Sequence, residues 1–568
     1  MLAGLARLIS VAKGELPADL LLANAKVVNV FTGEIEPGNV AICGDRIAGV
    51  GDYHHAKQVL DLGGKYVAPG LINGHTHLES SMLDIAQYAR AVVPRGTLAL
   101  VTDLHEIANV CGLEGIRYVM NRARRLPFEL FLMAPSCVPA SPLETSGASL
   151  ELEDIRQILR WRGCIGLGEV MNFPGVLSGD VSMLDKIGLA RGKVVDGHAP
   201  GVSRKNLSAY IAAGIYSDHE SVSLDEAKEK LRQGMWVMIR EGSSEKNLDA
   251  LLPLVTDKTY KRCFFVVDDR SCVDLLRDGD IDAVVRKAIR LGLDPVRAIQ
   301  MATINTAEYF RLDRLGAIAP GYLANLVVIR DLSGLMIDMV FCRGRLVARQ
   351  GAPLFPLSQV VDSGITDTVK VKPFNIEALR LLASGEKGLV IELIPGQIIT
   401  RKRVEKVKVV DGVILPDIDR DILKLVVVER HKATGNIGLG LVRGFGLKRG
   451  ALASSIAHDS HNIISVGTSD EDIFATVKEI ERLSGGLVVA AGGKVLASLA
   501  LPVAGLLSDE PLEVVVDKLE KLERLARKLG ATLPAPFAAL SFLALPVIPE
   551  LRLTDLGLVD VNEFKLVK

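Results

Sequence analysis

Residues 68–82, Ala-Pro-Gly-Leu-Ile-Asn-Gly-His-Thr-His-Leu-Glu-Ser-Ser-Met, place two histidines directly after a short apolar run. Alternate residues of a β-strand point to the same face, so His75 and His77 can present two imidazoles side by side. Neutral imidazole is a common ligand of divalent transition-metal ions. A His-x-His pair alone is equally consistent with two polar residues at a strand end, so its meaning depends on the rest of the chain.

The composition favours a protein with large buried cores and a small-molecule partner. Hydrophobic residues make up 49% of the chain, charged residues 24%, and the formal net charge is −1. Such a charge provides no long-range attraction to nucleic acid or to an anionic membrane. The seven cysteines have no Cys-x-x-Cys spacing, which indicates reduced thiols and a cytoplasmic location. Residues 485–507 are apolar but contain Lys494 and Pro502, so they predict two strands around a Gly-Gly turn, not a membrane helix.

Between residues 66 and 310, short apolar strands alternate with helical stretches. The clearest strands are 98–102, 131–134, 165–168, 193–196 and 264–267, and helices are expected at 150–162 and 223–233. This alternation is typical of a parallel sheet with both faces covered. The segment spans about 245 residues, close to the roughly 250 of a (β/α)8 barrel.

The flanks of this segment have a different, β-rich character. Strands separated by Gly-containing turns are expected within 19–50 and again within 316–347. We therefore expect an α/β protein with a (β/α)8 barrel, a small β-sandwich domain built from both flanks, and a C-terminal α/β domain. The expected boundaries are 1–65 and 313–360 for the two parts of the small domain, 66–312 for the barrel, and 361–568 for the last domain.

Residues of metal-ligand type follow five of the expected barrel strands. After His75 and His77 come Glu169, His198, His219 and Asp268, each at or just beyond the end of an apolar strand. Each alone has a structural explanation, such as a helix-capping carboxylate or a core histidine. As an ordered set they indicate a site, because the active site of a barrel lies at the carboxyl ends of its strands.

The set comprises four imidazoles and two carboxylates, which is enough for two adjacent divalent ions. Two such ions about 3.5–4 Å apart share a bridging ligand and activate water. Glu169 is the natural bridge because a carboxylate has two oxygens. Asp268 can bind metal and also accept the proton of the attacking water and pass it on.

Longer segments carry a specific resemblance to a known family. They are Asn73-Gly-His-Thr-His-Leu-Glu-Ser-Ser-Met-Leu, Asp103-Leu-His-Glu-Ile-Ala-Asn-Val, Ala134-Pro-Ser-Cys-Val-Pro-Ala, Gly168-Glu-Val-Met-Asn-Phe-Pro-Gly-Val, Asp196-Gly-His-Ala-Pro, Ser217-Asp-His-Glu-Ser, Val267-Asp-Asp-Arg and Ala457-His-Asp-Ser-His-Asn. The chain resembles the bacterial and archaeal adenine deaminases of the amidohydrolase superfamily, over nearly its whole length. It departs from the expected pattern at Leu104, Val267 and Asn325, where Pro, Thr and Asp are usual.

The resemblance implies that the (β/α)8 barrel is of the metal-dependent amidohydrolase type. It also implies hydrolysis of adenine to hypoxanthine and ammonia in purine salvage. It implies a binuclear centre with Mn²⁺ or Fe²⁺, Zn²⁺ being the alternative. His75 and His77 would bind one ion, His198 and His219 the other, Glu169 would bridge them, and Asp268 would be the acid and base. We further expect a homo-oligomer in the cytoplasm, with adenine as its partner and without nucleic-acid or membrane binding.

Eight more residues are candidates for contacting the substrate or supporting the ligands: Glu79, Asp103, His105, Glu106, Asp269, Arg270, His458 and His461. Asp103, His105 and Glu106 could also hold a third metal, or simply begin a helix with favourable acidic residues. Glu79 could cap a helix, and Arg270 could orient carboxylates or lie on the surface. His458 and His461 fit either a local turn or the entrance of the site.

Two other functions remain open from the sequence. A cyclic-amide hydrolase of the dihydroorotase or hydantoinase kind would use the same metals on an amide bond. A non-catalytic metal-binding protein could retain the barrel without turnover. The complete set of six ligand-type residues speaks against the second of these functions.

Overall fold

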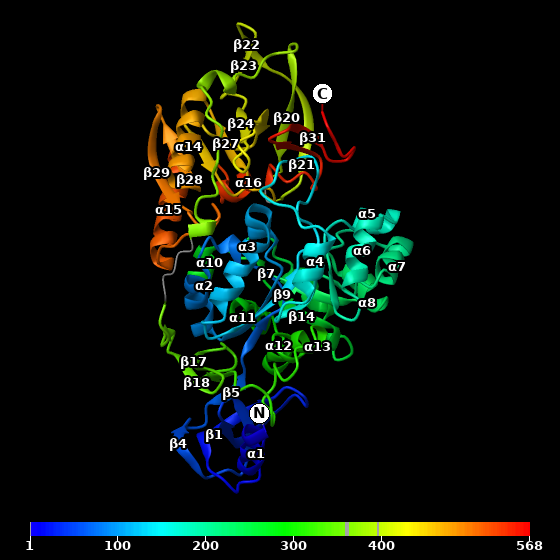
Figure 1. Cartoon of the computed structure of the whole chain (residues 1–568), viewed down its shortest axis with the longest axis vertical. Helices are drawn as coiled ribbons and strands as arrows, with labels where there is room; N and C mark the ends of the chain where they lie inside the picture. Colours follow the sequence, from blue (N-terminus) through cyan, green and yellow to red (C-terminus); the bar gives the residue numbers. More distant parts are fainter. Residues whose placement is uncertain (1, 358–362, 395–396, 568) are drawn as a thin grey trace.

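The computed structural model describes residues 2–357, 363–394 and 397–567. Three regions follow one another along its longest axis (Figure 1). A β-sheet lies near the N-terminus, a parallel sheet with helices occupies the middle, and a second large sheet with helices lies at the other end. The expected boundary between residues 360 and 361 lies outside the described residues.

The middle region is a curled series of short parallel strands. Five form one sheet, in the order β11-β10-β9-β8-β6, three form β12-β13-β14, and β15 pairs with β7. Their bounds are β6 (Leu71–Asn73), β7 (Thr76–His77), β8 (Thr97–Thr102), β9 (Glu129–Ala134), β10 (Cys164–Val170), β11 (Val194–Gly197), β12 (Ser217–Asp218), β13 (Trp236–Arg240), β14 (Cys263–Val266) and β15 (Asp268–Asp269). The parallel strands expected from the sequence are therefore present.

Strand β8 shows why these segments are continuously apolar. Ala99 and Val101 pack inside, in a cluster that includes Phe264 and Met133, whereas Leu98 and Leu100 pack in the larger cluster outside. Because successive side chains alternate between two buried faces, every position of the strand must be apolar or small.

Helices follow the parallel strands and cover their outer face. They are α2 (Ile85–Val92), α3 (His105–Ala123), α4 (Leu152–Leu159), α5 (Phe173–Ser178), α6 (Val181–Leu189), α7 (Arg204–Ala212), α8 (Leu224–Arg232), α9 (Leu248–Leu251), α10 (Cys272–Arg277), α11 (Ile281–Arg290), α12 (Pro295–Met301) and α13 (Ile304–Tyr309). Helix α8 begins where Ser223 accepts a hydrogen bond from the backbone N–H of Glu226, as is typical of an N-cap. Both helices expected from the sequence are confirmed, although each is shorter than predicted.

The region near the N-terminus is one nine-stranded sheet to which both flanks contribute. Helix α1 (Leu2–Ala12) packs against it. Its strands are β1 (Ala18–Asn29), β2 (Glu34–Cys43), β3 (Arg46–Gly51), β4 (Ala56–Asp61), β5 (Tyr66–Pro69), β16 (Leu326–Ile329), β17 (Ile337–Cys342), β18 (Arg345–Arg349) and β19 (Ala352–Pro353). The two flanks meet where β5 pairs antiparallel with β16. The strand expected at residues 316–321 is wrong: this segment is a loop, with Gly316 at φ +80° and Pro320 unable to donate to a ladder.

The C-terminal region contains an eight-stranded sheet in the order β21-β20-β25-β24-β27-β26-β28-β29, with one parallel pair, β20 with β25. The strands are β20 (Lys387–Leu393), β21 (Thr400–Lys406), β24 (Ile422–Val428), β25 (Ile437–Arg443), β26 (Ala451–Ser454), β27 (Ile463–Gly467), β28 (Gly486–Ala491) and β29 (Lys494–Ala500). Two smaller sheets are β22 (Lys408–Val410) with β23 (Val413–Leu415), and β30 (Leu551–Thr554), β31 (Gly557–Asp560) and β32 (Lys565–Leu566).

Three helices pack on this second sheet: α14 (Asp470–Leu483), α15 (Leu512–Lys528) and α16 (Pro536–Phe542). Val426 of β24 packs with Ile473 and Val477 of α14, whereas its neighbours Leu425 and Val427 join the core on the opposite face. The segment 485–507 forms strands β28 and β29 around Gly492 and Gly493, as predicted. In the described part of the chain, no helix combines the length and apolar character that crossing a bilayer requires.

Candidate metal centre

Strands β6 and β7 place the first two histidines at the carboxyl end of the parallel sheet. His75 lies between these strands and His77 ends β7, and both side chains are buried. Their rings meet edge to face, with centroids 4.8 Å apart. The expected side-by-side pair of imidazoles is therefore present.

Glu169 of β10 lies between two sets of histidines. Its Oε1 is 3.3 Å from Nε2 of His77 and 3.9 Å from Nε2 of His75. Its Oε2 is 2.8 Å from Nδ1 of His198 and 3.3 Å from Nε2 of His219. The two oxygens of one carboxylate thus face different pairs of imidazoles.

Asp268 completes the set on the side of the first pair. Its Oδ1 is 3.1 Å from Nε2 of His77 and 3.5 Å from Nε2 of His75. Its Oδ2 accepts a hydrogen bond of 2.7 Å from Nη1 of Arg240. The backbone of Asp268 adopts φ +61°, which is uncommon for a residue other than glycine.

The buried charges shift one another's proton affinities. Burial raises the pKa of Glu169, but its contacts with His198, His219 and His77 lower it well below the ordinary value. Burial lowers the pKa of His219, but contacts with Glu169 and Glu220 raise it well above the ordinary value. The carboxylates are therefore held ionised, which is the form that binds metal.

These residues fit divalent ions. In the described residues, the buried Nε2 of His75, which faces both Glu169 and Asp268, lacks a hydrogen-bond partner. Buried polar atoms usually have a partner. The ligand atoms of His75, His77 and Asp268 lie within 4.8 Å of one another, as do those of His75, Glu169 and His219. Imidazole and carboxylate donors in this arrangement suit first-row divalent metals.

Two residues of the site were not predicted from the sequence. Oε1 of Glu220 is 3.4 Å from Nε2 of His219 and 3.7 Å from Nδ1 of His198. Arg240, the last residue of β13, binds Glu220 and Asp268 together. The rule that polar residues at strand ends face the site would have identified Arg240, and Glu220 directly follows a predicted ligand.

Asp103 and His105 support the first pair of histidines. Oδ1 of Asp103 is 2.9 Å from Nδ1 of His105 and 3.4 Å from Nδ1 of His77. His105 is also 3.9 Å from Oε1 of Glu169. One ligand atom of each of these residues lies within 4.8 Å of those of His77 and Glu169, so both lie beside these two predicted ligands.

Glu106 connects the parallel-sheet region to the C-terminal region. Its Oε1 is 2.7 Å from Nδ1 of His458, and its Oε2 is in contact with Nε2 of His461. The two histidines therefore face the candidate site and are not confined to a local turn.

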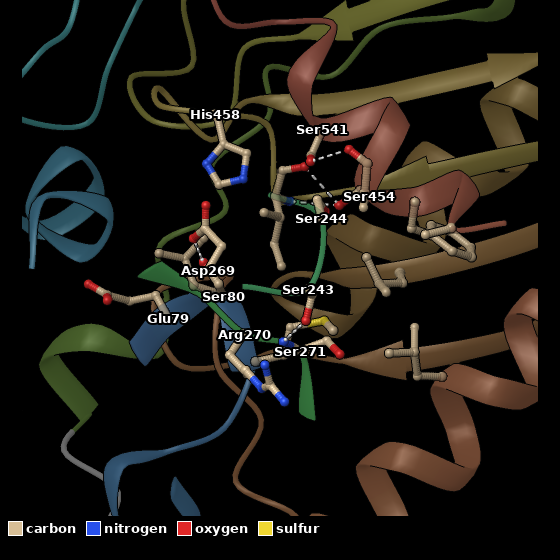
Figure 2. Close-up of a pocket in the computed structure, with 18 of the residues that line it drawn as sticks. Glu79, Ser80, Ser243, Ser244, Asp269, Arg270, Ser271, Ser454, His458 and Ser541 are labelled. Atoms are coloured by element: carbon tan, nitrogen blue, oxygen red, sulfur yellow. Dashed lines mark hydrogen bonds between the residues drawn. The ribbon is translucent and has the colours of Figure 1, made fainter. Parts of the chain in front are cut away.

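A cavity of about 320 Å³ lies between the strand-end loops and the C-terminal region (Figure 2). Glu79, Glu106, Asp269 and His458 line one side, and Figure 2 shows Asp269 beside Ser80 and facing His458. Apolar side chains of the C-terminal region also line it, among them Ile456, Leu487, Leu506, Phe537 and Phe542. None of the six predicted ligands lines this cavity, but it adjoins them through Asp269 and Glu106. Its size and mixed lining suit a small, flat, partly polar ligand.

Glu79 and Arg270 differ in how they use their polar atoms. Oε1 of Glu79 accepts a bond of 3.3 Å from the N–H of Ile107 in the first turn of α3, while its Oε2 has no hydrogen-bond partner in the described residues. Burial, followed by the nearby Glu106 carboxylate, raises the pKa of Glu79 to about 7.

Arg270 donates to the backbone carbonyls of Gly279 and Glu241. The expectation that Arg270 orients carboxylates is therefore wrong for its direct hydrogen bonds, and Arg240 has that role.

Comparison with known proteins identifies related families for both halves of the chain. Residues 66–347 match the amidohydrolase family, and residues 397–565 match the adenine deaminase C-terminal domain. An adenine deaminase of Dehalococcoides mccartyi is 64% identical over 567 residues, covering 100% of this chain and 99% of that protein. Adenine deaminase 2 of Carboxydothermus hydrogenoformans is 51% identical over 561 residues, covering 99% of this chain and 98% of that protein.

Among solved structures, a β-aspartyl dipeptidase of Fervidobacterium islandicum AW-1 aligns with a TM-score of 0.46 and 18% identity, covering 59% of this chain and 99% of that chain. The family assignment comes from the full-length sequence matches, not from this alignment. The chain belongs to the adenine deaminase family of the amidohydrolases.

Proposed function

We propose that this protein hydrolyses adenine to hypoxanthine and ammonia. The observation that carries the proposal is the Glu169 carboxylate between two pairs of imidazoles, with Asp268 beside it. The full-length similarity to proteins named adenine deaminase supports the choice of substrate.

Two divalent ions are the proposed cofactors, Mn²⁺ or Fe²⁺ first and Zn²⁺ as the alternative. His75 and His77 would hold one ion, His198 and His219 the other, and Glu169 would bridge them, with Asp268 a further ligand of the first. When bound, such ions supply Lewis acidity that lowers the pKa of water near neutral pH. The unpartnered Nε2 of His75 and the ionised carboxylate of Glu169 support this assignment.

The proton transfers are assigned to two carboxyl groups. As a water oxygen adds to C6 of adenine, Asp268 accepts the water proton, and a donor protonates the ring nitrogen on which negative charge develops. We assign that donor to Glu79, because it lines the cavity and its Oε2 has no hydrogen-bond partner in the described residues. Asp268 then protonates the amino group, the C6–N bond breaks, and ammonia leaves. The proton of the C6 hydroxyl returns to the donor as the carbonyl of hypoxanthine forms, so atoms and charges balance.

The cavity between the two regions is the proposed purine pocket. Phe537 and Phe542 would contact the ring, and Asp269, held by Ser80, would accept a hydrogen bond from it. Asp103 and His105 would keep His77 in place, and Arg240 would keep Asp268 oriented towards the ions.

The finer architecture is part of the same proposal. We propose that β6, β8–β14 and their helices form a closed (β/α)8 barrel, which the pairing of Asp268 with Thr76 supports because it joins the last strand to the first. The four-part domain division, the β-sandwich description of the small domain, the cytoplasmic location and the homo-oligomer remain predictions.

The test combines metal analysis with an assay for ammonia and hypoxanthine formation from adenine. Mn²⁺-loaded protein should deaminate adenine and leave dihydroorotate and hydantoin intact; ring opening of either imide without deamination would favour the cyclic-amide hydrolase instead. Asp268→Asn should lower turnover by about 10²–10⁴-fold, the usual contribution of a general acid–base, while the metal content stays close to that of the wild type. Full activity of this variant would refute the role of Asp268.

A further inference from the structure

A second cluster of metal-ligand side chains lies outside the six residues assigned to the binuclear centre. It consists of Glu106 at the start of α3 and of His458 and His461 in the C-terminal region. One ligand atom from each of the three lies within 4.8 Å of the others. Glu106 and His461 are buried, and the side chain of His458 is 12% exposed.

Both oxygens of Glu106 are directed at imidazole nitrogens. Nδ1 of His458 faces Oε1 at 2.7 Å, and Nε2 of His461 contacts Oε2. In the described residues, the ion-pair partners of Glu106 are histidines, namely His105, His458 and His461, and none is a lysine or arginine. The carboxylate therefore has no permanent cation as its counter-charge.

Asp459 lies beside this cluster and, within the described residues, has a carboxylate oxygen without a partner. Its side chain is only 5% exposed, and its Oδ1 is 3.9 Å from the same Nδ1 of His458 that faces Glu106. Its Oδ2 has no hydrogen-bond partner in the described residues. A buried carboxylate oxygen without a partner is costly unless a cation or an ordered water completes it.

We propose that Glu106, His458 and His461 form a third divalent-metal site, with Asp459 beside it as a further oxygen donor. Two imidazoles and one or two carboxylates suit Mn²⁺, Fe²⁺ or Zn²⁺ better than the hard ions Ca²⁺ and Mg²⁺. The site is separate from the binuclear centre, because the ring of His105 lies between Glu106 and His77, with its centroid 4.6 Å from that of His77.

A cation in this position would join the start of α3 to the C-terminal region. Glu106, His458 and His461 line the wall of the cavity described above. The third ion would therefore fix that wall in place from two segments more than 350 positions apart in the sequence. If no ion binds, the same residues form only hydrogen bonds with one another. A metal site and a hydrogen-bonded cluster can therefore be distinguished by the metal content of the protein.

The experiment measures metal per chain in full-length protein loaded with Mn²⁺ and freed of excess ions. Wild-type protein should hold three equivalents. Glu106→Gln keeps the shape and hydrogen-bonding ability of the side chain but removes its charge, and this variant should hold two. His54→Gln, a change in an exposed histidine of the loop between β3 and β4, should still hold three.

Anomalous diffraction at the manganese edge from wild-type crystals provides a second measurement that depends on no variant. A peak between Glu106, His458 and His461 is expected in addition to those at the binuclear centre. Two equivalents per chain and no peak at this position would overturn the third site while leaving the binuclear centre intact. Loss of the peaks beside Glu169, or no turnover of adenine, would instead count against the proposed function.

Discussion

Two buried arginines near the site show that a side chain's partners, not its type, assign its role. Arg240 donates to the carboxylates of Asp268 and Glu220. Arg270, only slightly further along the chain, donates to backbone carbonyls. A guanidinium that binds a carboxylate stabilises the ionised form of that carboxylate and fixes its orientation. A guanidinium that binds backbone carbonyls connects loops instead. Arg240 is therefore the arginine that acts on the chemistry.

Replacing Arg240 by Gln should lower kcat/KM for adenine by roughly 10–100-fold. The estimate follows from about 1.5–3 kcal/mol for a hydrogen bond to a charged group, at 1.36 kcal/mol for each tenfold change in rate. Steady-state kinetics of the Mn²⁺-loaded variant test it. Arg286→Gln is the matched control: that arginine pairs with Asp282 within α11 and should leave kcat/KM within about twofold. Equal rates for wild type and Arg240→Gln would contradict the assigned role.

Helix α8 holds the loops that carry His198 and His219. Its fully buried Lys230 donates to the carbonyl of Ala199 and to Oδ2 of Asp218, each at 2.8 Å. Oδ1 of Asp218 in turn accepts a 2.9 Å bond from the N–H of Ala199. Ala199 follows His198 and Asp218 precedes His219, so this ion pair joins the second pair of ligands. Burial raises the pKa of Asp218, but the effect of Lys230 in the opposite direction is larger. The pKa of Asp218 therefore stays below the ordinary value.

Replacing Lys230 by Met should destabilise the protein by about 3–5 kcal/mol at pH 8, because Asp218 is left as an unpaired buried charge. Without Lys230, the pKa of Asp218 in the folded state should rise above its unfolded value. The folded variant then binds more protons than the unfolded one, so its stability falls as pH rises. The deficit relative to wild type should therefore be smaller at pH 5 than at pH 8, as measured by urea unfolding. Lys228→Met, on the same helix, is the control, and a deficit independent of pH would contradict the argument.

At the scale of the whole molecule, the candidate site lies where the parallel-sheet region meets the C-terminal region. Leu83 forms an isolated β-bridge with Ser508. The backbone N–H of Ser508 donates a hydrogen bond of 2.8 Å to the carbonyl of Met82. The N–H of Thr145 donates to Asp555 at 2.9 Å, and one hydrophobic core includes residues of both regions. The cavity therefore exists only in the folded chain, where segments far apart in the sequence meet.

Removing the metals should lower the thermal stability of the whole protein. Ions that bind only the folded chain stabilise it by about 2.7 kcal/mol per site at a hundredfold excess over Kd. Calorimetry should show a lower Tm after chelation and dialysis, and recovery on adding Mn²⁺. Mg²⁺ should not restore it, since imidazole-rich sites disfavour that hard ion. An unchanged Tm in metal-free protein would argue against structural coupling between the ions and the fold.

Several features followed from local patterns in the chain. Continuous apolar runs between helical stretches predicted the parallel strands, because a strand buried on both faces must be apolar throughout. The ends of those strands predicted that His75, His77, Glu169, His198, His219 and Asp268 converge, and the structure brings all six together. The loop at 316–321 was missed, because a Gly-rich apolar segment resembles a strand until its hydrogen bonds are known.

The amino-acid order alone was sufficient for the class of fold and for the six side chains that converge at the candidate metal centre, because parallel strands bring their carboxyl ends to one edge whatever surrounds them. Folding in three dimensions settled which oxygen of Glu169 faces which histidines, which arginine binds Asp268, and that Glu106 meets His458 and His461. Those contacts join residues far apart in the chain. They depend on how side chains pack across an interface, and no local periodicity records that packing.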